Sequence, residues 1–275
     1  MNVRSKSLPR EIFTANCLNR PLGLSGHCIL IQPGRISMSE TWLVIDSTSL
    51  DLRVSLIQGE KCVSSDPSLI PGRDLSIKLL PMMDNLLKES SCTLSDLNGI
   101  ALCLGPGSFT GTRIAIATCR AIAECDGPKI VGFTLFHAQA LYFASQCEPS
   151  KDQKILCMVH ARADIHYRAV MELCNGIPGI VEEPCLTRVS DIDPGSMEVV
   201  ATWDRDGGEP DFGGAVTVHR YRHSAIPAQE LVRSIQSGAS LLPGPGTGGW
   251  KRDIMPLYLQ EPFATAKDRT LPGLV

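Results

Sequence analysis

Short apolar runs alternate with longer amphipathic stretches through the first half of the chain, from residue 41 onward. Short apolar runs favour buried strands, whereas apolar positions that repeat every three or four residues favour helices. The pattern predicts strands at residues 41–46, 52–58, 97–104 and 130–132, and helices at residues 74–89, 112–124 and 135–145. The first two strands lie close enough together to indicate a hairpin. Strands that alternate with helices at this spacing predict a layered α/β fold with parallel strand pairing.

The second half opens in the same way, after a polar linker at residues 146–153. Two strands are predicted at 155–160 and 167–173, followed by a turn at 175–179. Further along, the pattern predicts a strand at 198–202, an alternating strand at 216–223, a helix at 227–237 and an edge segment at 256–260. Because both halves open with two strands, we expect two related α/β halves.

The N-terminal stretch, residues 1–37, has no clear periodicity and is followed by Met38. Three interpretations stay open: a disordered leader, a start site placed too early with Met38 as the true one, or a real N-terminal extension. The predicted organisation is a leader at 1–40, an N-terminal lobe at 41–145, a C-terminal lobe at 146–262 and a tail at 263–275.

Composition and charge narrow the class of protein. Hydrophobic residues make up 43% of the chain and charged residues 20%, as in ordinary globular proteins. No run approaches the ~20 apolar residues of a membrane helix, so we expect no membrane partner. The 11 cysteines form no C-x-x-C pair, which favours buried thiols in a reducing cytoplasm. The formal net charge is −3, so the chain lacks the excess of basic residues that neutralises RNA phosphates. A partner would therefore supply most of the contacts with any bound tRNA.

A glycine-rich loop, GPGSFTGTR, lies between a predicted strand and a predicted helix. Glycines let a backbone approach another group closely, and a helix N-terminus favours anions, so the loop can be read as a phosphate cradle. It lacks the Lys-Ser/Thr pair of a P-loop, however, and a tight structural turn is the alternative. The motif residues are Gly105, Pro106, Gly107, Ser108, Phe109, Thr110, Gly111 and Arg113.

The helix predicted at 74–89 is apolar over a wide arc. At about 100° per residue its leucines and methionines cover roughly 160°, whereas a helix packed on one side needs about 100°. The extra apolar surface is either covered within the chain or available to a partner. The helix at 112–124 is rich in Ala and Ile, and its small side chains allow another backbone to come close.

The segments 73–81 (RDLSIKLLP), 94–111 (LSDLNGIALCLGPGSFTG) and 112–132 together resemble the TsaB family. That family shows a helix with L-L-P, a strand, the motif G-P-G-S-F-T-G-x-R, and an Ala/Ile-rich helix. The glycine-rich core is highly specific. Supporting matches, within a resemblance that covers residues 41–262, lie at Ile45–Ser49, at 132–135 (GFTL) and at the closing Pro256–Gln260.

The resemblance implies the actin/Hsp70-like (ASKHA) ATPase fold with two α/β lobes. It implies a non-catalytic dimerisation subunit of the complex that attaches threonylcarbamoyl to an adenosine next to the tRNA anticodon. Its partners would be the catalytic subunit TsaD, the ATPase TsaE and, through the complex, tRNA. The chain itself would need no cofactor, and ATP at the subunit boundary stays open. The implied partner interface comprises Leu75, Leu79, Met82, Met83, Leu86, Leu87, Ile114, Ala117, Thr118 and Ala121.

Several positions bear on catalysis. The sister enzyme holds its metal with an H-x-x-x-H pair, and the aligned positions here are Leu135 and Gln139, which cannot serve as imidazole ligands. We therefore predict no metal. Asp46, with Ser47, is a candidate nucleotide contact, although Asp46 capping its own turn is the alternative. The chain also departs from the family at His160, where D-A-R becomes H-A-R, and at Leu75, where the family often has His.

Three further candidates carry weaker signals. Ser108 is not surrounded by the G-x-S-x-G elbow of a nucleophile. His219 and His223 have an H-x-x-x-H spacing, but they lie on a predicted strand without an adjacent acidic ligand. His137 is expected to be hydrogen-bonded or at the surface rather than a ligand.

The sequence therefore leaves hypotheses from different classes. The first is a non-catalytic subunit that binds TsaD. The alternative is a stand-alone ATP-binding or peptidase-like enzyme of the same fold. A homodimer formed through the apolar helical face when the chain is alone is a third.

Overall fold

A computed structural model describes residues 40–49, 52–64, 74–124, 127–147, 153–202, 210–212, 216–222, 226–237 and 254–257. Residues 1–39 of the predicted leader and the whole predicted tail lie outside these residues, as does His223. Within the described residues, no helix is long and apolar enough to cross a membrane.

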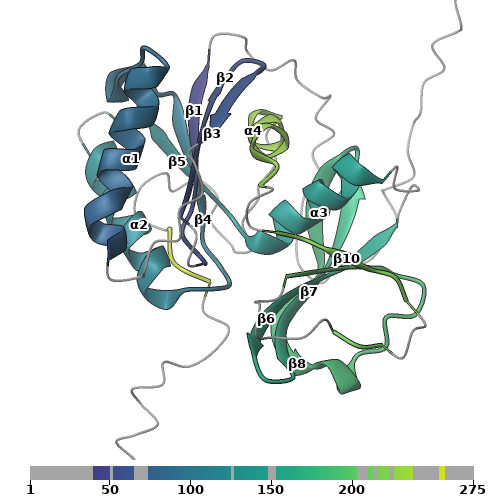
Figure 1. Ribbon diagram of the computed structural model, residues 1–275. Helices are drawn as coiled ribbons and strands as arrows, with labels where there is room; N and C mark the ends of the chain where they lie inside the picture. The colour runs from purple at the N-terminus through teal and green to yellow at the C-terminus, as the bar shows by residue number, and fades with distance from the viewer. Residues whose placement is uncertain are drawn as a thin grey trace, which may run out of the picture. The chain divides into compact units, whose positions relative to one another are not determined.

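The first sheet has the strand order β3-β2-β1-β4-β5 (Figure 1). The strands β1 (Thr41–Asp46) and β2 (Arg53–Gln58) form the predicted hairpin, and β3 (Lys61–Ser64) continues it in antiparallel fashion. On the other side, β4 (Gly99–Cys103) pairs in parallel with β1, and β5 (Lys129–Phe133) pairs in parallel with β4. The predicted parallel pairing is confirmed.

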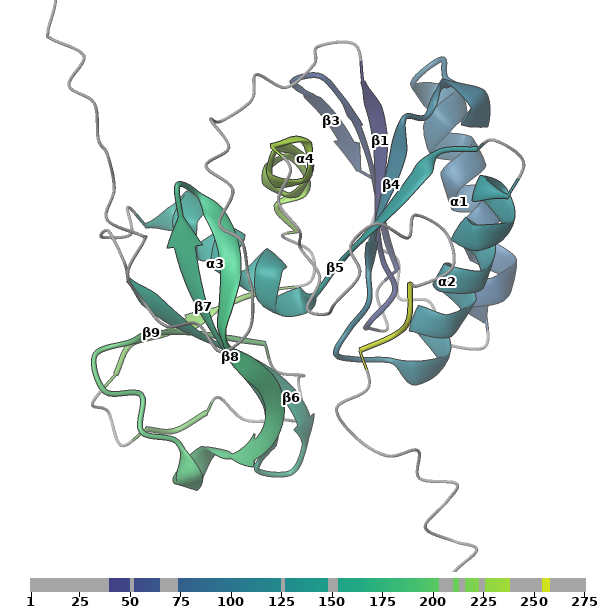
Figure 2. The ribbon, with the colours of Figure 1, turned by 180° about the vertical axis from the view of Figure 1, so that it is seen from behind.

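Helices cover both faces of this sheet. The helices α1 (Leu75–Glu89) and α2 (Phe109–Ala123) lie side by side on one face, as Figures 1 and 2 show. On the opposite face, α4 (Ala228–Gln236) packs on β1 and β2. Successive side chains of β1 therefore enter different cores, because strand residues alternate between faces: Leu43 packs with α1 and α2, whereas Trp42 joins the cluster with α4.

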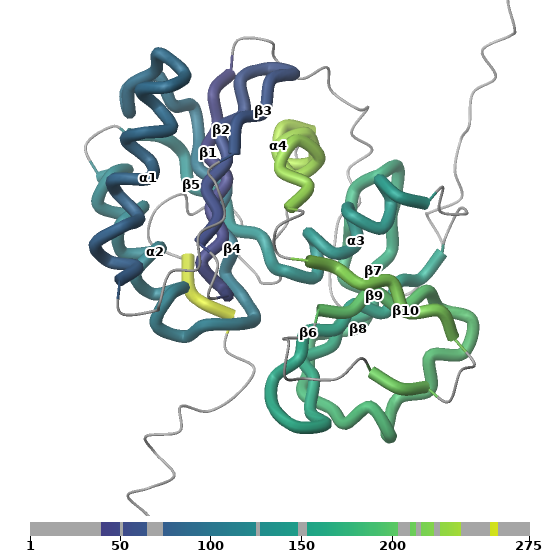
Figure 3. Tube along the Cα trace, in the orientation of Figure 1, coloured from purple at the N-terminus to yellow at the C-terminus, as the bar shows by residue number. Residues whose placement is uncertain are grey.

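The second sheet repeats the topology of the first, with the order β8-β7-β6-β9-β10 (Figure 3). Here β6, β7 and β8 form the antiparallel meander, and β9 and β10 extend it in parallel. The strands span Lys154–Arg162, Ile165–Cys174, Ile177–Arg188, Glu198–Thr202 and Val218–Arg220. The expectation of two related halves is confirmed at the level of topology.

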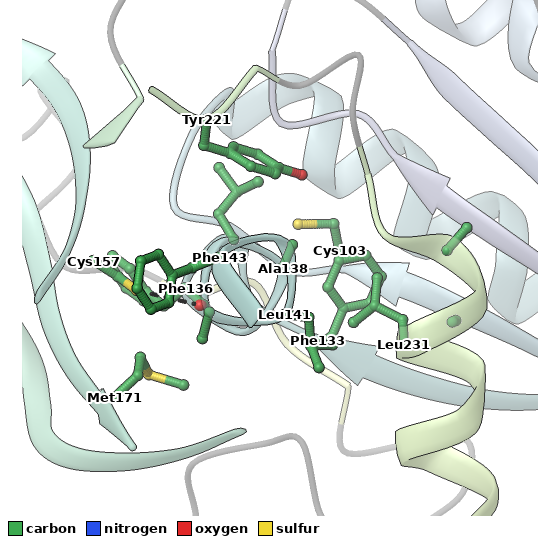
Figure 4. Packing of buried hydrophobic residues seen from close by; sticks show 14 of the residues in the cluster. Cys103, Phe133, Phe136, Ala138, Leu141, Phe143, Cys157, Met171, Tyr221 and Leu231 are labelled. Carbon is green, nitrogen blue, oxygen red and sulfur yellow. Dashed lines mark hydrogen bonds between the residues drawn. The ribbon is translucent and has the colours of Figure 1, made fainter. Parts of the chain in front are cut away.

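A single apolar cluster includes residues of both sheets, with α3 (Leu135–Gln146) at its centre. This helix packs on the strands of the second sheet and also contacts α4. Figure 4 shows Phe136 and Phe143 of α3 toward Cys157 and Met171 of the second sheet. The thiol of Cys157 donates a hydrogen bond to the carbonyl of Phe136 at 3.6 Å.

Two strands are absent from the predictions, and one helix begins earlier than predicted. The strands β3 and β8 were not predicted, because both are edge strands with many exposed or half-exposed positions, and residues 177–179 of the predicted turn belong to β8. The helix α2 begins at Phe109, three residues before the predicted start. Its N-cap is Ser108, whose hydroxyl accepts a hydrogen bond from the Gly111 amide at 3.1 Å.

Candidate functional site

The carboxyl ends of β1 and β4 meet at one edge of the first sheet, the edge at which α/β folds commonly bind ligands. Asp46 ends β1 and is fully buried. Its Oδ1 accepts hydrogen bonds from the Thr48 amide at 2.9 Å and from the Thr48 hydroxyl at 2.6 Å. Asp46 therefore caps its own turn, and neither it nor the buried Ser47 reaches solvent in this arrangement.

The glycine-rich loop packs against this turn. A Cβ at Gly107 would lie 2.3 Å from the Thr48 carbonyl oxygen, and one at Gly111 would lie 2.2 Å from that of Ser47. The Ser108 amide also donates to the Thr48 carbonyl at 2.6 Å. These glycines thus allow a close approach to the chain's own backbone, which favours the tight structural turn over the phosphate cradle.

Two more buried groups fill the space beside Asp46. Cys103, at the end of β4, and Tyr221 both lie in the central cluster, and Figure 4 shows the Tyr221 ring reaching toward Cys103. Burial raises the pKa of both side chains, and the nearby carboxylate of Asp46 raises each pKa further. The edge is therefore closed by a neutral thiol and a neutral phenol.

The positions aligned with the sister enzyme's metal ligands lie on α3 and are buried. Leu135 lies in the apolar cluster. Gln139 donates through Nε2 to the Met158 carbonyl at 2.7 Å and to the Thr202 hydroxyl at 2.8 Å. Both side chains thus serve packing and cohesion between α3 and the second sheet.

The histidines near these positions also have structural partners. His137 is hydrogen-bonded, as expected: its Nδ1 lies 2.6 Å from the hydroxyl of Thr134, the N-cap of α3, and burial lowers its pKa to about 3. His219 Nε2 lies 3.1 Å from a carboxylate oxygen of Glu198. In the part of the chain that the structure describes, no three or more His, Cys, Asp or Glu side chains come together as a metal site.

The predicted partner interface divides into two groups. Five of its ten residues pack into the chain's own core, so their apolar surface is covered from within and is unavailable to a partner; they are Leu75, Leu79, Met83, Leu86 and Leu87. The wide apolar arc is explained by packing on both the sheet and α2. The other five remain partly or fully exposed: Met82, Ile114, Ala117, Thr118 and Ala121.

The predicted interface omits the most exposed apolar residues of this layer. Ile77 is 71% exposed and Leu80 50% exposed, both on the side of α1 turned away from the sheet. Of these two residues, only Leu80 was part of the predicted apolar arc. Ile77 could have been recognised as a large aliphatic residue between polar neighbours, which favours exposure. Phe109, at the start of α2, is 43% exposed and lies under the Arg113 guanidinium, 4.7 Å from its ring centroid. We call Ile77, Leu80, Ala117 and Ala121 the outer face of α1 and α2.

Comparison with known proteins agrees with this architecture. The family model of TsaD, tRNA N6-adenosine threonylcarbamoyltransferase, matches residues 69–209. The TsaB protein of Buchnera aphidicola from Schizaphis graminum is 38% identical over 86 residues, which are 31% of this chain and 40% of that protein. The TsaB protein of Escherichia coli K12 is 36% identical over 81 residues, 30% of this chain and 34% of that protein. The chain thus spans less than half the length of these curated relatives.

A solved structure extends the likeness over more of the chain. YeaZ from Pseudomonas aeruginosa superposes with a TM-score of 0.61 at 23% identity, covering 80% of this chain and all of that one. At that identity the likeness establishes the fold, which is the actin/Hsp70-like fold expected from the sequence. The TsaD family model spans just over half of the chain, and several TsaB proteins match beside it. The chain therefore belongs to the threonylcarbamoyltransferase family described by that model, among its TsaB (YeaZ) members.

Proposed function

We propose that this chain is a non-catalytic subunit in the biosynthesis of threonylcarbamoyladenosine in tRNA, and that it binds a TsaD-type catalytic subunit through the outer face of α1 and α2. The observation that carries the proposal is the exposure of Ile77 and Leu80 on a helix whose other side is already fully packed. Large aliphatic side chains exposed together on a rigid element are typical of surfaces that associate with another protein.

The shape of the outer face suits a helical partner. Ala117 and Ala121 are exposed and lie one helical turn apart on α2, so a partner helix can approach its backbone closely. On α1, Ile77 and Leu80 also lie about one turn apart and offer the apolar area that a partner would bury. The small residues on α2 and the larger ones on α1 together form an uneven apolar surface against which a partner helix can pack.

The buried edge of the first sheet supports a non-catalytic role. Leu135 and Gln139 replace the imidazoles expected in the catalytic sister, and both are held by protein contacts. Asp46 and Ser47 are covered by the glycine-rich loop. With a formal net charge of −3, the chain would contact tRNA mainly through its complex, in which the ATPase TsaE is a further expected partner.

The proposal is tested by co-purification of the full chain with the TsaD-type subunit of the same organism. The variant Ile77→Asp, Leu80→Asp places two carboxylates where the partner would bury apolar groups, and burying unpaired charges costs several kcal/mol. We expect the wild-type chain to form a stable heterodimer and the double variant to elute alone while keeping the wild-type melting temperature.

The matched control is Val181→Asp, which changes an apolar residue of similar exposure on β8, away from this face. It should bind like the wild type. If the double variant still binds, the interface is elsewhere. If the wild-type chain runs alone beside the catalytic subunit, the proposed function fails, and turnover of ATP by the chain itself becomes the assay of the alternative.

A further inference from the structure

Two histidines face each other across the hairpin of β6 and β7. His160 and His166 are direct cross-strand partners, with ring centroids 5.2 Å apart and ring planes at 68°. Just beyond the pair the strand register shifts, and Ala163 takes a left-handed φ of 49°. In the TsaB family, position 160 usually carries the Asp of D-A-R, so the pair is a departure of this chain that the proposed function does not explain.

Hydrogen bonds to backbone carbonyls indicate which ring nitrogens carry protons. His160 Nε2 lies 3.0 Å from the Ala163 carbonyl oxygen, and His166 Nδ1 lies 3.4 Å from that of Asp164. A carbonyl oxygen can only accept, so these two nitrogens are the donors. In the neutral rings, His160 Nδ1 and His166 Nε2 therefore carry lone pairs. Histidines that bind metals are commonly oriented in this way, with the second nitrogen donating to a carbonyl or carboxylate.

The second histidine has a polar atom that the protein leaves unsatisfied. His166 is 3% exposed, and its Nε2 has no hydrogen-bond partner among the described residues. Buried polar atoms nearly always have a partner, so such an atom indicates a bound water or ion.

We propose that His160 and His166 form a two-histidine site for a borderline divalent transition-metal ion such as Ni²⁺ or Zn²⁺, with water completing the coordination. Imidazole nitrogens suit these ions. Because a metal–nitrogen bond is about 2.0–2.1 Å long, two imidazoles on one tetrahedral ion have centroids roughly 5 Å apart, close to the spacing in this hairpin. Asp164 lies in the turn between the strands, and its Oδ2 is 3.7 Å from Arg188 Nε.

Titration of the full, tag-free chain with Ni²⁺ tests this site. Binding is measured by calorimetry and by changes in the histidine ring signals of NMR spectra. Thiolates also bind such ions, so the assignment depends on the difference between the wild type and His160→Asn. This variant changes a half-exposed side chain and should keep the wild-type melting temperature. We expect one ion whose affinity falls at least about tenfold in the variant, since even outer-shell partners are worth about 10–100-fold.

The control is His219→Asn, which removes a histidine paired with Glu198 on another strand. It should leave Ni²⁺ binding unchanged, and Ni²⁺ should shift the ring signals of His160 and His166 alone. The proposal is overturned if His160→Asn binds Ni²⁺ as tightly as the wild type, or if the affected signals belong to other histidines. His166→Gln, which tests the second ligand, must weaken binding as well.

Discussion

At the scale of single residues, glycines and a histidine organise the edge where the parallel strands of the first sheet end. Gly107 and Gly111 allow the loop to lie on the turn formed by Ser47 and Thr48. His137 completes a capping box with Thr134 at the start of α3. The glycines are required because no side chain fits at their positions, and His137 because it forms hydrogen bonds within the chain. Substitution of either kind of residue should therefore change the stability of the protein.

Gly111→Ala should destabilise the protein by about 1–3 kcal/mol, because the new Cβ would lie 2.2 Å from the Ser47 carbonyl oxygen and the backbone would have to shift. This loss would appear even though Ala is the better helix former by about 0.5–1 kcal/mol. Gly179→Ala is the control: its Cβ would come no nearer than 3.9 Å to any atom, and we expect a change within about 0.5 kcal/mol. Urea unfolding of both variants measures this; equal effects would contradict the packing of the loop.

His137 should make the protein less stable in mild acid. Burial lowers its folded-state pKa to about 3, below the ordinary value of 6.5. Between these two pH values the unfolded state binds a proton that the folded state does not, so stability falls as pH decreases from about 6.5 toward 3. His137→Gln keeps a capping-box side chain at this position and does not titrate. The free energy of unfolding of this variant, measured from pH 7 to pH 4, should decline less steeply than that of the wild type, and parallel curves would refute the assignment.

At the scale of elements, α1 has two sides with different roles. Its buried side, including Met83, completes the core over the first sheet, while Ile77 and Leu80 point away from it. A helical projection alone gives the angular width of the apolar surface but not how much of it the neighbouring sheet and helix cover. The sequence pattern was therefore able to locate this layer, but it could not separate core residues from exposed ones.

The two sides of α1 should respond differently to truncation. Met83→Ala removes a side chain that is 1% exposed and should cost about 2–5 kcal/mol of stability. Leu80→Ala, on the exposed side, should change stability by no more than about 0.5 kcal/mol while weakening binding to the catalytic subunit. Chemical denaturation and a pull-down assay separate the two effects. A large loss of stability in Leu80→Ala would show that this residue belongs to the core.

Strand prediction succeeded and failed for a common reason. The strands β1, β4 and β9 are buried on both faces and appear as apolar runs, so their positions were predicted to within two residues. The edge strand β8 contains Pro178, Gly179 and Pro184 and is mostly half-exposed, so its sequence resembles a loop. Its pairing with β7 depends on a partner strand that local sequence does not reveal. The covering of Asp46 was likewise not predictable from local sequence, because Tyr221, which lies beside it, comes from a distant part of the chain.

At the scale of the whole molecule, residues of both sheets share one apolar cluster. Phe133 of the first sheet, Phe136 of α3 and Cys157 of the second sheet all belong to it, together with Leu231 of α4. A shared core couples the stability of the elements that line it, because opening one side exposes apolar surface on the other.

This coupling predicts one cooperative unfolding transition. Cys119, on the buried side of α2, and Cys157, in the second sheet, are both buried, and burial raises the pKa of both thiols, that of Cys119 to about 12. Both thiols should therefore become reactive toward an alkylating reagent at the same urea concentration, as followed by mass spectrometry of labelled peptides. Exposed Cys62 should react without denaturant and serves as the internal control. Labelling of Cys157 at lower urea than Cys119 would show that the second sheet unfolds independently.

The return of late segments to the first sheet has a consequence for synthesis on the ribosome. The helix α4 covers the face of β1 and β2 that carries Trp42, and the Leu257 amide donates to the Leu104 carbonyl at 2.8 Å. At about 5–20 residues per second, the roughly 100 residues between β5 and the end of α4 take about 5–20 s to translate. During that interval the nascent first sheet has one uncovered apolar face, so vectorial folding of this chain has an obligatory aggregation-prone stage that ends only after α4 has emerged.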